Sequence, residues 1–149
     1  MAYTTIDDPS AYFQTATYTG TSDDSAKVVT NDGNSDLQPD LLWIKARSGT
    51  YSDRDHALYD SSRGATKRLE SSTTDTEATD SGNSFSSDGF TLTANYTING
   101  PGTEYVGWQW KANGGTTSSN TDGNVTVTLQ ANTTAGFSIG TWTSNGGTS

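Results

Sequence analysis

The residues of this chain that could catalyse a reaction do not form a catalytic pattern in the sequence. His56 is the only histidine and lies in the polar segment 53–56. A Ser-His-Asp arrangement would need His56 as its base, yet the Gly-x-Ser-x-Gly turn that carries many such serines is missing. Glu70 and Glu104 lie near the ends of expected strands, but no strand face offers the paired carboxylates of a glycosidase. We therefore expect His56 to be a solvated loop residue and the chain not to be an enzyme.

Residues 32–36, Asp-Gly-Asn-Ser-Asp, are the best candidate for a metal site. Their oxygen atoms at alternate positions match the start of a calcium-binding loop. The glycine that such a loop needs at its sixth position is replaced by Leu37, and the closing bidentate glutamate is missing. We interpret the segment as a polar turn and expect no metal and no cofactor. The absence of cysteine also excludes a disulfide framework, an iron–sulfur cluster and thiol catalysis.

Three asparagines begin triplets of the N-glycosylation type, namely Asn95, Asn124 and Asn132. Such triplets arise often by chance in a chain that is rich in Asn and Thr, so their use stays open.

The composition favours strands and disfavours polyanionic partners. The 149 residues are 30% hydrophobic and 17% charged, and the formal net charge is -9. This charge repels nucleic acid and an anionic membrane surface, and the Lys and Arg residues form no run. No basic segment followed by an apolar run comes after Met1, so we expect no signal peptide in this sequence.

The elements that must position these residues are short strands separated by Gly, Asn, Asp and Ser turns. The pattern predicts strands over residues 13–19, 26–29, 41–46, 57–60, 67–70, 90–94, 105–110, 125–129 and 137–143. Many short strands at this spacing predict an all-β, antiparallel β-sandwich of the jelly-roll or concanavalin-like kind.

The two-residue period of a strand predicts which side chains form the core. In residues 105–111 it places Val106, Trp108 and Trp110 on one face, which we expect to be buried, with Gln109 on the other. In residues 124–130 it places the valines inside and the threonines outside. The expected core residues are Leu42, Ile44, Phe90, Leu92, Val106, Trp108, Trp110, Val125 and Val127.

An internal similarity relates the two ends of the chain. Residues 11–20 align without gaps with residues 135–144, and Tyr18 aligns with Trp142. The chain thus reads as one complete unit followed by the first strand of another. We expect residues 1–20 and 131–149 to be inter-subunit segments that flank a sandwich body over residues 21–130. The expected assembly residues are Tyr12, Phe13, Tyr18, Phe137, Ile139 and Trp142.

Long phrases of the sequence resemble an uncharacterised domain, often found as tandem units, of predicted structural proteins of aquatic bacteriophages. The phrases are residues 2–15, 37–45, 60–67, 87–90 and 105–115. The resemblance implies a jelly-roll or concanavalin-like sandwich in a virion or fibre. In that family residues 135–139 resemble the start of a following unit, which agrees with the internal alignment.

Two functions remain open from the sequence. In the first, the chain is a structural subunit of an extracellular or virion filament and forms a head-to-tail homopolymer by donating a terminal strand. In the second, it is a carbohydrate-binding module in which aromatic residues such as Trp43, Tyr51 or Tyr96 stack on surface glycans. We favour the first, because it accounts for the repeated aromatic strand.

Overall fold

The computed structural model describes residues 6–21 and 25–146 of the chain. Almost every element in this part is a strand. The two exceptions are a 3-10 turn, η1, and a single-turn helix, α1. In chain order the elements are η1 (Pro9–Ala11), β1 (Phe13–Thr19), β2 (Lys27–Val29), β3 (Leu41–Ser48), β4 (Ala57–Asp60), β5 (Gly64–Leu69), β6 (Ala78–Thr79), β7 (Ser84–Ser86), β8 (Gly89–Leu92), α1 (Tyr96–Asn99), β9 (Glu104–Trp110), β10 (Ser118–Asn120), β11 (Val127–Asn132) and β12 (Phe137–Trp142).

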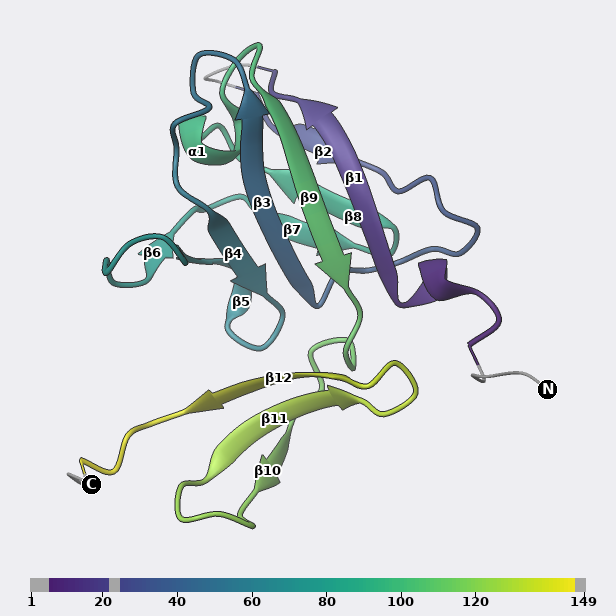
Figure 1. Cartoon of the computed structure of the whole chain (residues 1–149), viewed down its shortest axis with the longest axis vertical. Coiled ribbons are helices and arrows are strands. Elements are labelled where there is room, and N and C mark those ends of the chain that lie inside the picture. The colour runs from purple at the N-terminus through teal and green to yellow at the C-terminus, as the bar shows by residue number, and fades with distance from the viewer. Residues whose placement is uncertain (1–5, 22–24, 147–149) are drawn as a thin grey trace.

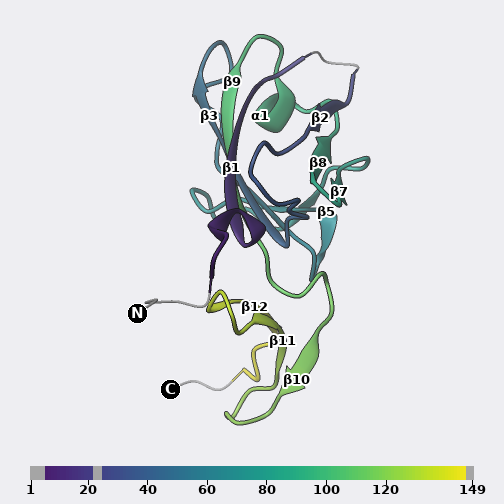
Figure 2. The ribbon, with the colours of Figure 1, turned by 90° about the vertical axis from the view of Figure 1, so that its right-hand side faces the viewer.

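In the described residues the strands form three antiparallel sheets. A six-stranded sheet has the order β1-β9-β3-β4-β5-β6, and a three-stranded sheet has the order β2-β8-β7. These two sheets face each other as the layers of a sandwich, seen edge-on in Figure 2. The third sheet, β10-β11-β12, lies beyond one end of the sandwich, below it in Figure 1. The expected all-β antiparallel sandwich is confirmed. Within the described residues no helix is long and apolar enough to cross a membrane.

Local sequence explains where the two helical elements begin. Asp8 caps η1 by accepting a hydrogen bond from the Ser10 backbone N–H at 2.9 Å, and Pro9 stands in the first turn, where its missing N–H costs nothing. Asn95 caps α1 in the same way, through the backbone N–H of Thr97 at 2.8 Å. Both caps use short polar side chains whose oxygen accepts a backbone N–H of the first turn.

The core lies between the two layers of the sandwich. It contains the expected residues Leu42, Ile44, Phe90 and Leu92, all at most 1% exposed. Val106 is also buried, although it is not part of the central cluster. The remaining members of that cluster are Tyr18, Val29, Ala46, Ala57, Tyr59, Ile98 and Tyr105.

The prediction for the two tryptophans of β9 is wrong, because the strand presents its other face to the core. Tyr105 and Gln109 are fully buried, whereas Trp108 and Trp110 are half-buried on the outer face of the six-stranded sheet. Gly107 lies on the inner face, where a Cβ would be 3.3 Å from both the Leu42 and Phe90 side chains, so a larger residue there would have to displace these core side chains. The inner row is therefore Tyr105, Gly107 and Gln109.

The prediction is also wrong for Val125 and Val127. Both are only half-buried, and Val125 lies outside any strand. The reason is that β11 pairs with β12 in the third sheet and not with the sandwich. Residues 127–130 therefore belong with the C-terminal strand rather than with a body that extends to residue 130. At the other end, β1 pairs with β9 along its whole length and is part of the sandwich.

The three strands that the sequence pattern missed are short. They are β6, β7 and β10, with two or three residues each. The nine expected strands all correspond to observed ones, with ends shifted by up to three residues.

Candidate functional site

The outer face of the six-stranded sheet carries a continuous row of mostly apolar side chains. Cross-strand pairing aligns Trp108 with Trp43 and Trp43 with Leu58. The complete row, from β1 to β5, is Thr15, Trp108, Trp43, Leu58 and Leu69. Paired residues of antiparallel strands share a face, so these side chains all point away from the core. We call Trp43, His56, Trp108 and Trp110 the aromatic face.

The Trp43 ring contacts two other rings of the aromatic face, those of Trp108 and His56. The centroids of Trp43 and Trp108 are 5.7 Å apart with an interplanar angle of 62°. His56 packs against Trp43 with centroids 5.5 Å apart. The four residues line a shallow depression of about 390 Å³.

His56 is oriented by a hydrogen bond from Trp43. The indole Nε1–H donates to His56 Nδ1 at 2.8 Å. Because an indole nitrogen can only donate, Nδ1 acts as an acceptor and the proton of the neutral ring lies on Nε2. The backbone N–H of His56 donates to Ser72 Oγ at 3.3 Å, and that hydroxyl donates to Asp55 at 2.9 Å. The expectation of a solvated loop histidine is wrong in this respect, since the ring packs in a half-buried position.

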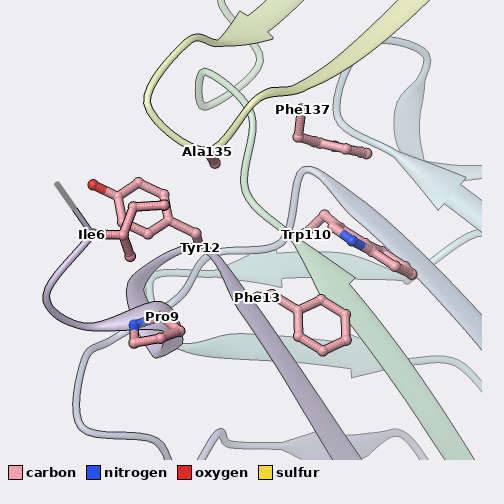
Figure 3. Close-up of a pocket in the computed structure, with 7 residues that line it drawn as sticks. All are labelled: Ile6, Pro9, Tyr12, Phe13, Trp110, Ala135 and Phe137. Atoms are coloured by element: carbon pink, nitrogen blue, oxygen red, sulfur yellow. The ribbon is translucent and has the colours of Figure 1, made fainter. Parts of the chain in front are cut away.

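Trp110 extends the aromatic face into a crevice beside the N-terminal segment, drawn in Figure 3. Phe13 lies against Trp110 with centroids 5.0 Å apart, and Phe137 stacks on Trp110 at 6.0 Å with an interplanar angle of 20°. The crevice is lined by Ile6, Pro9, Tyr12, Phe13, Trp110, Ala135 and Phe137. Three expected assembly residues, Tyr12, Phe13 and Phe137, thus meet within one chain.

The other expected assembly residues lie apart from this crevice. Tyr18 is buried in the core, where its hydroxyl donates to the Ile98 carbonyl at 2.7 Å. Its ring stacks on Tyr105 at 5.1 Å. Burial raises the pKa of the Tyr18 hydroxyl well above its usual value. The expectation that Tyr18 is an assembly residue is therefore wrong, because its side chain is buried in the core of its own chain. Ile139 is half-buried, and Trp142 is 67% exposed.

A buried polar network joins the C-terminal sheet to the sandwich. Gln130 is fully buried, and its Oε1 accepts hydrogen bonds from the backbone N–H groups of Asn113 at 2.9 Å and Gly115 at 2.7 Å. Its Nε2 donates to Ser61 Oγ at 3.0 Å, and the Ser61 hydroxyl donates to Asp40 at 2.6 Å. The sequence analysis missed Gln130 and Asp40, because a buried Gln or Asp has no signature that separates it from a surface one.

The Asp40 carboxylate is the centre of this network. It accepts hydrogen bonds from the backbone N–H groups of Ala112 at 2.7 Å and Gly114 at 3.0 Å, and from the Ser61 hydroxyl. Segments far apart in the sequence therefore converge on one buried side chain. This arrangement stabilises the junction. Its donors and acceptors are hydrogen-bonded to one another.

A second polar cluster joins β4 and β5 to the segments that follow β6 and β8. Tyr59 donates to Asp80 at 2.6 Å, Asn95 donates to the same carboxylate at 2.7 Å, and Arg68 lies 3.4 Å from it. Burial, with the nearby Asp80 charge, raises the pKa of Tyr59 well above its usual range. The cluster is a structural ion-pair network on the inner side of the sheet.

The remaining sequence candidates do not gather into a site. Glu70 pairs with Arg68 at 3.3 Å, whereas Glu104 accepts from Ser48 at 2.6 Å at a different sheet position. Tyr51 and Tyr96 pack against each other at 4.5 Å, beside α1. In residues 32–36, Ser35 donates to Asp8 at 2.6 Å. Among the described residues, no group of three His, Cys, Asp or Glu side chains is placed to hold a metal ion.

The edges of the sheets differ sharply in length. Four edge strands, β2, β6, β7 and β10, have only two or three residues. The other two, β1 and β12, have seven and six residues. Both long edges lack charged residues and proline, the features that usually protect an edge from pairing with another chain. They are also the two strands that the internal alignment relates.

Comparison with known proteins gives one family. No curated protein and no solved structure matches the chain significantly. Residues 8–149 match a family described as Domain of unknown function (DUF7483). Because this match covers the sandwich, the junction and the C-terminal sheet, the chain belongs to the DUF7483 family.

Proposed function

We propose that the protein is a structural subunit of an extracellular or virion-associated filament or fibre. In this proposal, β12 of one subunit pairs with the exposed edge of β1 in the next. The observation that carries it is the pair of long, uncharged edge strands in one chain, β1 in the six-stranded sheet and β12 in the C-terminal sheet. Two different edges give a head-to-tail contact, which repeats without closing unless the subunits form a ring.

The likeness of β1 and β12, combined with their opposite burial, supports this proposal. Tyr18 of β1 is in the core, whereas the aligned Trp142 of β12 is 67% exposed. Trp142 pairs with Val127, and Gly140 pairs with Leu129, so the outer face of the C-terminal sheet carries apolar side chains. The two strands have a similar sequence, but the face that carries Tyr18 in β1 is covered by the core, whereas the face that carries Trp142 in β12 is exposed. Contact with a neighbour would cover it.

The distribution of charge also supports contact at this sheet. The chain has a net charge of -9, yet Asp122 is the only charged residue between positions 112 and 149. The C-terminal sheet therefore approaches another copy with less repulsion than the sandwich would. An association cost of about 4–15 kcal/mol opposes the new hydrogen bonds, which contribute about 0.5–1.5 kcal/mol each, so assembly should depend on concentration.

Sedimentation and electron microscopy of the full chain test the proposal. We expect polymers whose length increases with concentration. Ser138→Lys places a charge on β12 and should prevent polymerisation, because a charged edge opposes strand pairing. Ala131→Lys is the matched control, since Ala131 is exposed, lies on the central strand β11 and pairs directly with Ser138. Equal effects of both variants would contradict pairing through β12.

Mixing two blocked subunits tests the direction of assembly. Thr17→Lys changes an exposed residue of β1 and leaves β12 intact, whereas Ser138→Lys leaves β1 intact. A head-to-tail contact predicts that neither variant polymerises alone and that their mixture stops at dimers. Association of Thr17→Lys with itself would instead show a symmetric contact through β12. A wild-type chain that is monomeric at every concentration would refute assembly altogether.

A further inference from the structure

The aromatic face has the shape and the lining of a ligand site that the proposed assembly does not use. Its depression is shallow and open, and it is lined by residues of β3 and β9 together with His56. The proposed assembly instead pairs the free backbone edges of β1 and β12. Trp43, Trp108 and Trp110 supply apolar ring surfaces from β3 and β9. Aromatic rings of this kind pack against the C–H faces of pyranose rings, which are apolar on one side and rich in hydroxyls at the rim.

The same residues supply hydrogen-bond donors around the rings. The Trp43 bond to Nδ1 leaves His56 Nε2–H as a donor. Within the described part of the chain, the indole N–H groups of Trp108 and Trp110 have no acceptor either. The residues that line the depression therefore have three N–H groups without an acceptor in the described part of the chain. Sugar hydroxyls provide such acceptors.

The charge of the site restricts the ligand to neutral sugars. None of the four lining residues is an acid, a lysine or an arginine. Lys45 shares the outer face, but its Nζ donates to the carbonyls of Ser52 at 2.9 Å and Arg54 at 2.7 Å. An anionic ligand would therefore find no uncommitted cation here and would meet the net charge of -9.

We propose that the aromatic face binds a neutral saccharide, with Trp43 and Trp108 contacting its ring faces and His56 donating to a hydroxyl. An apolar protein partner fits less well, because it would bury three N–H groups without acceptors. This site differs from the sugar-stacking set expected from the sequence, since Tyr51 and Tyr96 pack against each other elsewhere.

Fluorescence titration of the full chain with neutral oligosaccharides tests this site, because the site itself contains tryptophans. The probes are the hexasaccharides of glucose, xylose, mannose and N-acetylglucosamine, with hexagalacturonate as the anionic comparison. We expect saturable binding of at least one neutral probe and none of hexagalacturonate. Trp108→Ala should weaken this binding about tenfold, through the loss of one stacking contact.

Three further variants separate the site from its alternatives. His56→Phe keeps a ring beside Trp43 but removes the donor, and we expect weaker binding with unchanged folding. Trp142→Ala removes the exposed tryptophan of the C-terminal sheet and should leave the affinity unchanged. Ser138→Lys should also bind normally, so a failure of assembly and a failure of sugar binding are distinguishable.

Two results would overturn the proposal. One is the absence of saturable binding of every neutral probe up to about 1 mM, which is weak binding by any standard. The other is an effect of Trp142→Ala as large as that of Trp108→Ala. Quenching of Trp108 fluorescence that follows protein concentration without sugar would show instead that a second copy covers this face.

Discussion

Replacement of Asp40 by alanine should remove a large part of the stability of the fold. The Asp40 side chain is fully buried, and its carboxylate accepts hydrogen bonds from the Ala112 and Gly114 backbone and from the Ser61 hydroxyl. A hydrogen bond to a charged group contributes about 1.5–3 kcal/mol, and the alanine variant would leave two backbone N–H groups without their acceptor. Since bonds within one network are not additive, we expect a loss of about 4–6 kcal/mol. The total free energy of unfolding of a domain of this size is about 5–15 kcal/mol.

Urea unfolding followed by circular dichroism measures this loss as a shift of the midpoint at constant slope. Asp40→Asn is the informative comparison, because its amide oxygen can still face the two N–H groups while its NH₂ donates to Ser61. We expect it to lose about half as much as Asp40→Ala, within the range of one charged bond. Asp36→Ala changes an exposed residue of the same segment and should have little effect. An Asp40→Ala chain within about 1 kcal/mol of wild type would refute the central role of this carboxylate.

Three other predictions follow from burial and from the junction. Gln130→Ala should loosen the C-terminal sheet while the sandwich stays folded, and hydrogen exchange should show faster exchange confined to residues 118–142. Tyr105→Ala should cost about 3–5 kcal/mol in urea unfolding, whereas Trp108→Ala should cost only about 1–2 kcal/mol because its ring is half-exposed. Stability should fall as the pH rises above about 10, because the unfolded chain then loses tyrosine protons that Tyr18 and Tyr59 retain when folded. Tyr59→Phe should reduce that slope in thermal melts at pH 10–11.

The sequence predicts the layers of this fold better than it predicts their faces. Leu42 and Ile44 alternate with Trp43 in a strand that is apolar on both sides, and the two aliphatic residues are the buried ones. In β9 the period is the same, but large side chains occupy the outer positions and the inner row contains Gly107 and Gln109. Burial of Gln109 depends on Asn31, whose side-chain oxygen accepts from Gln109 Nε2 at 2.6 Å. A partner 78 residues away cannot be read from local alternation.

The C-terminal sheet is a second case in which the two-residue period does not predict which face of a strand is buried. Alternation in residues 125–130 identifies one apolar face, but it does not show what covers that face. Gln130 lies on the other face, which it shares with Ile139 and Phe137 of β12. That face docks on the sandwich, through the polar network of Gln130 and through the stacking of Phe137 on Trp110. Docking through a buried amide leaves Val127, Leu129 and Trp142 on the outside. The hydrophobic pattern of β11 alone would assign the opposite orientation, because its valine and leucine lie on the outer face and its glutamine on the docking face.

The inverted orientations of β9 and β11 have the same physical interpretation. In β9 and in β11, the face with the larger apolar side chains points outward, and polar side chains with specific partners point inward. A chain that only had to fold would gain more by burying those tryptophans and valines, since burial of one large apolar side chain contributes about 1.5–3 kcal/mol. Sites where local rules fail are where function or binding is to be expected. The outward tryptophans of β9 offer ring faces with N–H donors, whereas the outward face of β11 and β12 offers aliphatic and aromatic surface along an unprotected edge. The first suits a sugar and the second suits another strand, which is why the two proposals assign different ligands to two faces of one chain.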